Sequence, residues 1–472
     1  MRILACSNSS PASVAAPTEA LRPDGAGGLV PHMLSLLGDA PGDWVFADAA
    51  PRPRAWPTEV NGVGLHPVVV SPDHRRQHYE TISIDTLQRL FHYLHDTGTD
   101  PLFDAGLHAA WHGYRAVNLA FADRLATVPT PSVVLVNDYH LMLLPGVVRR
   151  VGLPDDVPLV YSHGVPWCEP DYFAVLPGPI RVEILTSLLA CDRVVFHSSR
   201  WRAAFARCCD AFVPEAEIDE DHVDFRGRRT RLIVAPFPLD TAGVSRLRHA
   251  EGTRRWSDTL ARRAGGRRLV VRVERLDLWK NHLRGFAAYE SVVARHPGLV
   301  DEVWLLAVTA RPRYRSARHL AYEAACLAAV DRINAAHARP GRPEPVTMFG
   351  LDVPGNARER AVAALHQASV VLINPTYEGF GLVAKEAALL AGDAPLLVST
   401  TAGAYEELAS TMTPVDPFDV VGTADVLEAA VAGGASPDAR ERQRWRERIR
   451  TQTARDWMSR VLADDADDAH AA

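Results

Sequence analysis

The chain has 472 residues, of which 47% are hydrophobic and 23% are charged, and its formal net charge is −6 at pH 7. The length predicts two domains, and the composition is typical of a soluble globular protein without an apolar run long enough for a transmembrane helix. The negative net charge gives no electrostatic support to nucleic-acid binding, so any anionic ligand has to be met by local positive groups.

The opening residues and the cysteines indicate a cytoplasmic protein. The stretch MRILACSNSS has an apolar part too short for a secretory signal and predicts a first β-strand. The six cysteines form no Cys-x-x-Cys pair and no spacing typical of a metal site. We therefore expect reduced thiols rather than a disulfide framework.

Short β-branched runs alternate with longer helical patterns along most of the chain. Helical periodicity is clear at 284–296 and 318–336. This alternation predicts an α/β protein with two parallel sheets, each buried on both faces. The strands are predicted at 2–7, 132–137, 158–162, 193–197, 231–237, 268–273, 302–308, 346–350, 370–374 and 395–400.

A polar, arginine-rich stretch interrupts this pattern near residues 240–265. We place the domain junction there and predict Rossmann-like domains at 1–245 and 246–445. Doubly wound sheets bind ligands at the carboxyl ends of their strands, so we expect a ligand site in a cleft between two facing sheets.

Two predicted strands of the first half end in residues that could carry chemistry. Strand 132–137 runs into Asp138, and strand 158–162 runs into His163. Taken singly, each residue has a structural explanation, as a buried carboxylate or as a core histidine with satisfied nitrogens. Their equivalent positions at strand ends favour a shared functional site.

The second half offers a site for a diphosphate. Lys280 and Lys385 are the only lysines among 51 basic residues, and all the others are arginines. This bias indicates that Lys280 is at a position that needs a compact cation and not the planar guanidinium of arginine. Arg275 can place its planar fork on one phosphate while Lys280 neutralises the other as a mobile point charge. The role of Lys385 is left open.

The segment EGFGLVAKE, which begins at Glu378, adds backbone and carboxylate groups. Gly379 and Gly381 let backbone amides approach an anion, and the following helix points its positive end the same way. Glu386, two turns into that helix, can accept hydrogen bonds from the vicinal hydroxyls of a ribose. Together with a weaker glycine turn at 26–30, the cations and the EGFGLVAKE segment predict a nucleotide-sugar site without a metal.

These motifs, in this order, resemble those of GT-B glycosyltransferases of the trehalose-6-phosphate synthase family. The resemblance covers about residues 2–420 and includes SN followed by GGL near the start, NDYHL, HxxPW, VERLDxxK and GLVAKE. The chain also resembles the validoxylamine phosphate synthase-like pseudo-glycosyltransferases of the same fold in PWCEPDYFAVLP, around FRGRRTRL, and in the Lys-Asn of WKN.

The resemblance assigns roles to individual residues. Arg275 and Lys280 would bind the donor diphosphate, and Glu386 would bind the donor ribose. His163 and Glu378 would contact hydroxyls of the donor sugar, and Asp138 would face the reaction centre and the acceptor. The implied catalytic set is Asp138, His163, Arg275 and Lys280. The implied donor-binding set is Gly28, Arg275, Lys280, Glu378, Gly379, Gly381, Leu382, Val383 and Glu386, and the acceptor-binding set is Tyr79, Gln88, Asp138 and Arg313.

The resemblance also implies a mechanism and a domain order. Such enzymes retain the anomeric configuration by a front-face route in which the leaving phosphate helps to deprotonate the acceptor. The protein then supplies positioning and charge stabilisation. No metal and no cofactor are expected besides the nucleotide-sugar substrate, and a terminal helix at 446–466 is expected to cross back to the N-terminal domain.

Three positions depart from the family pattern. Ser9 stands where the family has an arginine that grips the acceptor phosphate, and Gln88 stands where it has a tryptophan, although Tyr79 matches. Glu378 replaces an aspartate. Loss of the arginine argues against glucose 6-phosphate as the acceptor, unless other arginines compensate. The candidates are Arg22, Arg311 and Arg313.

We therefore expect a metal-independent, retaining glycosyltransferase that moves a sugar from a nucleotide diphosphate to a small unphosphorylated polyol, sugar or aminocyclitol, in specialised metabolism such as antibiotic biosynthesis. Three alternatives stay open: a pseudo-glycosyltransferase that joins a nucleotide-linked cyclitol to an aminocyclitol through a C–N bond, a trehalose-6-phosphate synthase proper, and a nucleotide-sugar epimerase. The expected partners are the donor and the small acceptor, with neither nucleic acid nor membrane, and a homodimer is compatible with this interpretation.

Overall fold

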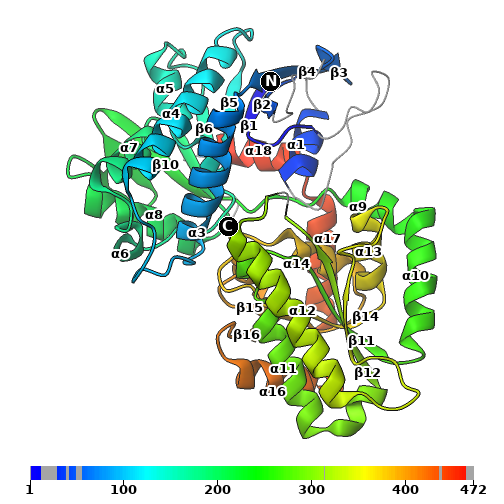
Figure 1. Ribbon diagram of the computed structural model, residues 1–472. Helices are drawn as coiled ribbons and strands as arrows, with labels where there is room; N and C mark the ends of the chain where they lie inside the picture. The colour runs from blue at the N-terminus through cyan, green and yellow to red at the C-terminus, as the bar shows by residue number, and fades with distance from the viewer. Residues whose placement is uncertain are drawn as a thin grey trace. The chain divides into compact units, whose positions relative to one another are not determined.

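A computed structural model shows two compact α/β units, and contacts divide the chain between them (Figure 1). Unit 1 comprises Met1–Phe237 and Ala454–Ala472, and unit 2 comprises Pro238–Thr453. The predicted fold class is confirmed, because each unit is built on a mostly or fully parallel sheet. The structure describes residues 2–11, 29–38, 42–48, 56–312, 314–434 and 438–463.

The sheet of unit 1 has ten strands: β1 (Ile3–Ser7), β2 (Gly42–Asp48), β3 (Glu59–Val60), β4 (Val63–Val69), β5 (Val133–Asn137), β6 (Leu159–Ser162), β7 (Arg193–Phe196), β8 (Glu217–Ile218), β9 (His222–Phe225) and β10 (Arg228–Val234). They lie in the order β3-β4-β2-β1-β5-β6-β7-β10-β9-β8. The seven strands from β4 to β10 in this order pair in parallel, and the short strands at the two edges pair antiparallel. Chain order reverses between β1 and β5, which makes this the switch point of the sheet.

The helices of unit 1 cover this sheet. One of them, α18, comes from the C-terminal end of the chain. Its Trp457 donates a hydrogen bond from Nε1 to the Ala235 carbonyl at 2.9 Å. Side-chain caps begin several helices; Ser198, for example, accepts a hydrogen bond from the Trp201 amide. The described helices are α1 (Leu29–Gly38), α2 (Pro72–Arg75), the π-helix η1 (Arg76–Gln88), α3 (Arg89–Phe91), α4 (Ala105–Leu125), the 3₁₀ helix η2 (Tyr139–Leu141), α5 (Leu144–Arg150), α6 (Pro170–Phe173), α7 (Gly178–Leu188), α8 (Ser199–Phe212) and α18 (Ala454–Leu462).

The sheet of unit 2 has six parallel strands: β11 (Arg268–Arg275), β12 (Val303–Ala310), β13 (Val346–Phe349), β14 (Ala368–Ile373), β15 (Leu396–Ser399) and β16 (Thr413–Val415). Their order is β13-β12-β11-β14-β15-β16, so the switch point of this sheet lies between β11 and β14. The carboxyl ends of these two strands are therefore the expected place for a ligand.

The helical segments of unit 2 pack on both faces of its sheet. They are α9 (Thr241–His249), α10 (Glu251–Ala264), η3 (Leu278–Lys280), α11 (His282–Arg295), η4 (Pro297–Asp301), α12 (Ala317–His337), α13 (Ala357–His366), α14 (Leu382–Leu390), α15 (Gly403–Leu408), η5 (Ala409–Thr411), α16 (Val420–Val431) and α17 (Ala439–Thr451).

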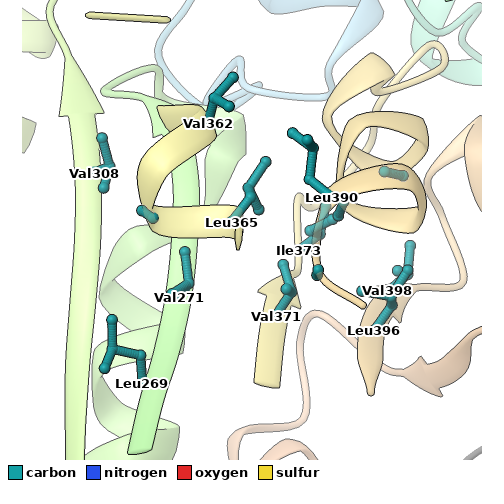
Figure 2. Close-up of a cluster of buried hydrophobic side chains, with 14 of the residues drawn as sticks. Leu269, Val271, Val308, Val362, Leu365, Val371, Ile373, Leu390, Leu396 and Val398 are labelled. Carbon is teal, nitrogen blue, oxygen red and sulfur yellow. The ribbon is translucent and has the colours of Figure 1, made fainter. Parts of the chain in front are cut away.

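Alternate strand residues supply the two cores of unit 2. Figure 2 shows one face, where Val362 and Leu365 of α13 and Leu390 of α14 pack with side chains of β11, β12, β14 and β15. The intervening strand residues, such as Val270 and Leu372, point into the second core with side chains of α11, α12 and α16. Burial on both faces explains why these strands are nearly continuous hydrophobic runs.

Two long strands of unit 1, β2 and β4, are absent from the predicted set. The β2 sequence, GDWVFAD, carries an aspartate near each end, which weakens its appearance as a buried strand. Asp43 is nevertheless buried because Arg2 and His66 lie at 2.7 and 2.8 Å from its carboxylate oxygens. Partners from two other strands thus make a charged residue acceptable inside the sheet.

The unit boundaries differ from the predicted ones. The predicted junction at 245/246 falls inside α9, and Val244 of this helix belongs to the core of unit 2, so unit 2 begins earlier, at Pro238. The predicted helix at 446–466 is two helices: α17 belongs to unit 2, and α18 belongs to unit 1. Polar, arginine-rich composition is therefore a property of surface helices here and not of a linker.

Candidate active site

The loops that follow β11 and β14 are tied together at the switch point of unit 2. Asn281 adopts a left-handed conformation with φ of 58°, and its Nδ2 donates to the carbonyls of Asn374 and Pro417 at 2.9 and 2.8 Å. The Thr376 amide donates to the Trp279 carbonyl at 2.8 Å. These bonds hold the segment that carries Lys280 in one place.

Lys280 lies between two carboxylates. Its Nζ is 2.7 Å from Glu274 Oε2 and 2.6 Å from Glu378 Oε2, and the three side chains are only 10%, 4% and 15% exposed. Burial alone would lower the pKa of Lys280, but the two carboxylates outweigh it and raise this pKa. The side chain is therefore a buried, permanently charged ammonium at the place where a donor diphosphate is expected.

Glu274 is a member of this cluster that the sequence analysis did not single out. Burial raises its pKa, and Lys280 opposes this effect by direct pairing. The available signal was the single carboxylate of β11, one residue before the carboxyl end of the strand.

Arg275 is half-exposed beside this cluster. Its Nη2 lies 2.8 Å from Asp277 Oδ2, and the Arg275 side chain is 38% exposed whereas that of Asp277 is 3% exposed. His282 Nε2 donates to the Arg275 carbonyl at 3.0 Å, and burial lowers the pKa of His282 to about 3, so this histidine is neutral. A buried carboxylate thus orients an accessible guanidinium fork.

The glycine segment after β14 leads into α14 as predicted. Gly381 has φ of 89° and caps the start of the helix, with Leu382 and Val383 packed on the core. The carbonyl of Gly379 would lie 2.1 Å from a Cβ built at Gly403, so the turn also requires a glycine from α15. The backbone amides at the start of α14 therefore form a compact turn of the kind that binds anions.

Glu386 lies on α14 with one positive neighbour. Arg358 Nη2, at the start of α13, donates to Glu386 Oε1 at 3.2 Å. Burial raises the pKa of Glu386, and Arg358 opposes the rise. Arg358 was not predicted as a site residue, because only the packing of α13 beside α14 brings it here.

Lys385 has a structural environment. Its side chain is fully buried, its Nζ lies 3.0 Å from Glu407 Oε2, and it lies 4.7 Å from the centre of the Phe380 ring. The second lysine of the chain is thus an interior partner of α15, which answers the question that the sequence left open.

Asp138 occupies the switch point of unit 1, directly after β5. Its φ of 70° is unusual for a residue other than glycine, and strain of this kind concentrates at functional sites. Its Oδ1 accepts a hydrogen bond from the Gly164 amide at 3.1 Å. Burial raises the pKa of Asp138 to about 6, although the amides of Tyr139 and Gly164 act in the opposite direction.

His163 is enclosed within unit 1. Its side chain is packed among the rings of Phe91, Trp167 and Phe196 and has no exposed surface. Nε2 donates to the Pro166 carbonyl at 3.2 Å, and Nδ1 accepts from Tyr161 at 3.0 Å. Burial lowers its pKa to about 3, so the imidazole is neutral. A direct contact between Nε2 and a sugar would require the hydrogen bond to Pro166, the longer of the two, to open.

The predicted acceptor residues of unit 1 lie against the NDYHL motif. Gln88 Nε2 donates to the Tyr139 hydroxyl at 2.9 Å, and the Tyr79 ring stacks on His140 with centres 5.9 Å apart. Both residues belong to the π-helix η1. This type of helix is rare in proteins, and where it occurs it is often at a functional site. Burial lowers the pKa of His140 to about 3, so the motif presents a neutral ring.

Several predicted residues are placed elsewhere or fall outside the described ranges. Arg311, considered as a replacement phosphate clamp, is held by Glu323 and Asp352 at 2.6 and 2.7 Å. The remaining ones, for which the structure describes nothing, are Arg22, Gly28 and Arg313.

The described ranges contain neither a metal-binding cluster nor a helix suited to span a membrane. No three histidine, cysteine, aspartate or glutamate side chains there are grouped as a metal site. No helix in the same ranges combines the length and apolarity needed to cross a bilayer. All six cysteines are described, and each is a buried free thiol.

Comparison with known proteins gives three related findings. Residues 27–466 match the family model of glycosyltransferase family 20. The chain is 28% identical, over 97% of its length, to a bifunctional trehalose-6-phosphate synthase/phosphatase of Thermoproteus tenax, of which it spans only 62%. It is 30% identical, over 78% of its length, to validamine 7-phosphate valienyltransferase of Streptomyces hygroscopicus subsp. jinggangensis, of which it covers 72%.

A solved structure agrees with this result at the level of the fold. The UDP-forming α,α-trehalose-phosphate synthase of Burkholderia xenovorans in complex with glucose-6-phosphate has a TM-score of 0.81 to this chain. The identity is 21%, and the match covers 98% of this chain and 99% of the other.

Proposed function

Since the chain belongs to glycosyltransferase family 20, we propose that it transfers a sugar from a nucleoside-diphosphate donor to a small hydroxylated acceptor, with retention and without a metal. It is a trehalose-6-phosphate synthase-like glycosyltransferase of GT-B fold. The observation that carries the proposal is the Lys280 ammonium held by Glu274 and Glu378 at the switch point of unit 2, beside the accessible fork of Arg275.

In the proposed reaction, the bond between the anomeric carbon and the diphosphate oxygen breaks, and the same carbon forms a bond to the acceptor oxygen. The acceptor proton passes to the leaving phosphate. Arg275 and Lys280 stabilise the negative charge that develops on the diphosphate, and in a water-poor site such groups contribute a few kcal/mol each. Side-chain cations thereby do the work that Mg²⁺ does in other transferases.

The donor ribose is assigned to Glu386. Its carboxylate has two acceptor oxygens, and Arg358 occupies only one of them in the structure. The other oxygen can accept from a ribose hydroxyl, and charge-assisted bonds of this kind are strong.

On the acceptor side we propose that Asp138 binds the attacking hydroxyl and that the acceptor carries no phosphate. Ser9 offers no cation, Gln88 is already bonded to a tyrosine hydroxyl, and Arg311 is neutralised by two carboxylates. The relatives are named for phosphate-bearing compounds, so the matched pair of acceptors is the decisive comparison. In a competition assay, we expect the unphosphorylated acceptor to be preferred; a tenfold preference for its phosphorylated form would refute this part.

A second candidate is transfer of a cyclitol from a nucleotide to an amine, with a C–N bond as the product. The 30% identity to a valienyltransferase favours this candidate. The donor-side groups described above are compatible with both reactions. Mass and NMR analysis of the product distinguishes a glycosidic oxygen from a secondary amine.

The first experiment is a thermal-shift screen of UDP, GDP and ADP on the whole chain. Binding to the native state raises the melting temperature, and at equal concentration the tightest ligand raises it most, so the correct base gives the largest shift. The nucleotide sugar of that base is then assayed with acceptors, and the anomeric configuration of the product is read by NMR. Absence of a shift with all three nucleotides would count against the proposed donor site.

A further inference from the structure

Arg272 lies in the middle of β11, and its charged guanidinium is buried without a salt bridge to any residue that the structure describes. Its side chain is 0% exposed, and its Nη2 donates to the Lys280 carbonyl at 2.9 Å. Among the residues that the structure describes, no hydrogen-bond acceptor meets its Nε or Nη1. A buried charge without a close counter-ion is unfavourable, and apolar replacements of buried ionic groups are often neutral or stabilising. Fold stability therefore does not explain this residue.

Gly285 of α11 makes room for the guanidinium. A Cβ built at this position would lie 1.5 Å from Arg272 Nη1, so no other residue fits without displacing the charged group. Glycine inside a helix is less favourable than alanine. Two features that are unfavourable for stability, a buried cation without a salt bridge in a strand and a glycine in the facing helix, therefore lie against each other next to the Lys280 carbonyl.

The charge count at the switch point shows what Arg272 contributes. Counted as ionised, Glu274 and Glu378 bring −2 and Lys280 brings +1, so these three groups sum to −1. Arg272 interacts electrostatically with Glu274, and its +1 brings the sum of the four groups to zero. Without Arg272, an incoming diphosphate would meet a buried cluster of its own sign.

We propose that Arg272 is a positioning residue of the donor site: it fixes the carbonyl of Lys280, and its charge offsets the two glutamates so that Lys280 can act on a diphosphate. Gly285 is the matching residue that allows this placement. The inference rests on the proposed function, because it assumes that the donor diphosphate binds at Lys280. Arg272 does not touch the donor itself.

The test compares Arg272→Met, which keeps most of the side-chain volume without the charge, with the wild-type chain. Affinity for inorganic pyrophosphate and for UDP, GDP and ADP is measured by calorimetry, and the melting temperature is measured in parallel. We expect affinity for pyrophosphate to fall at least tenfold while the melting temperature stays equal or rises. A merely structural residue would give the opposite pattern, because its loss lowers the melting temperature.

Two further variants serve as second test and matched control. Gly285→Ala retains the charge but displaces the guanidinium, and we expect it to lower pyrophosphate affinity at least threefold. Arg267→Met is the control, because Arg267, directly before β11, is also buried and donates to the carbonyls of Ala264 and Glu344. Its loss should lower the melting temperature and leave pyrophosphate affinity within twofold.

The outcomes separate the inference from the function on which it rests. If wild-type protein binds a diphosphate and Arg272→Met binds it within twofold, Arg272 has no role in the site and the proposed function stands. If Arg272→Met loses both stability and affinity while Gly285→Ala loses neither, Arg272 is structural. If wild-type protein binds neither pyrophosphate nor any nucleoside diphosphate, the proposed donor site is refuted, and the inference falls with it.

Discussion

In unit 2, the two strands beside the switch point lead into ionised side chains, with Lys280 held by Glu274 and Glu378. In unit 1, the strand in the same topological position leads into Asp138, whose neighbours Tyr139 and His140 are an uncharged phenol and a neutral imidazole. The same strand order thus supports two chemistries. A site for a diphosphate needs fixed cations, whereas a site for a hydroxyl group needs one carboxylate in a weakly polar surrounding.

The difference also appears in how each carboxylate is stabilised. Glu378 and Glu274 are countered by a cation within 2.7 Å, while among the described residues Asp138 is bonded by backbone amides and its pKa is raised to about 6. Perturbed pKa values cluster at functional sites, and here burial acts on Asp138 while a cation acts on Glu274 and Glu378. We therefore expect the two sites to respond differently to substitution.

The largest effect is expected from Lys280→Ala. Loss of the ammonium removes the charge that stabilises the leaving diphosphate, so kcat should fall by about 10²–10³-fold, with partial recovery in Lys280→Arg. Steady-state kinetics with the correct nucleotide sugar gives the value. The matched control is Lys385→Met, which removes the other lysine and should change the melting temperature more than kcat. Activity of Lys280→Ala within twofold of wild type would contradict the assignment.

Asp138→Asn is expected to give a smaller loss of activity together with a gain in stability. The folded-state pKa of about 6 lies above the ordinary value of 3.8, so the native state binds this proton more tightly than the unfolded chain does. That contribution to stability is present below pH 4 and is lost as the pH rises through 6. Above pH 6 the asparagine variant should therefore be more stable, by up to about 3 kcal/mol.

The pH profile completes this test. If Asp138 acts as a carboxylate, wild-type kcat rises as the pH increases through about 6, and the variant loses this limb. Unfolding in urea at pH 5 and pH 7.5 measures the stability change. A variant that is less stable than wild type at pH 7.5 would show that Asp138 is a structural carboxylate.

Glu386→Gln is expected to act on the nucleoside and not on the phosphates. Replacing a charged acceptor weakens its hydrogen bonds to ribose, so affinity for the correct nucleoside diphosphate should fall by about tenfold. Affinity for inorganic pyrophosphate should stay within twofold, which separates this residue from Lys280 and Arg275. Equal losses for both ligands would place Glu386 in the diphosphate site instead.

The smallest effect is expected from chelation. Because side-chain cations are proposed to stabilise the leaving group, turnover in EDTA should stay within about twofold of its starting value. Loss of turnover that added Mg²⁺ restores would contradict the metal-independent mechanism. The assay requires only the whole chain and the nucleotide sugar identified by thermal shift.

Much of the architecture is encoded locally. The strands that lead to the site, such as β5, β11 and β14, were predicted from short β-branched runs, because strands buried on both faces need nearly continuous apolar sequence. The residues that follow them, including Asp138 and Lys280, were found for the same reason, since the carboxyl ends of parallel strands are where ligands bind.

The fold class, the positions of the strand ends and the kind of group at each end can thus be predicted from the amino-acid sequence. Which of these groups become partners depends on how the strands and helices pack. Glu274 and Glu378 are far apart in the chain and meet at Lys280 because β11 and β14 are neighbours in the sheet. Arg272 and Gly285 face each other because α11 packs back on its own strand. The local hydrophobic pattern of a sequence predicts which residues are buried. Charge pairs depend on contacts between segments that are distant in the chain, so the local pattern does not predict them.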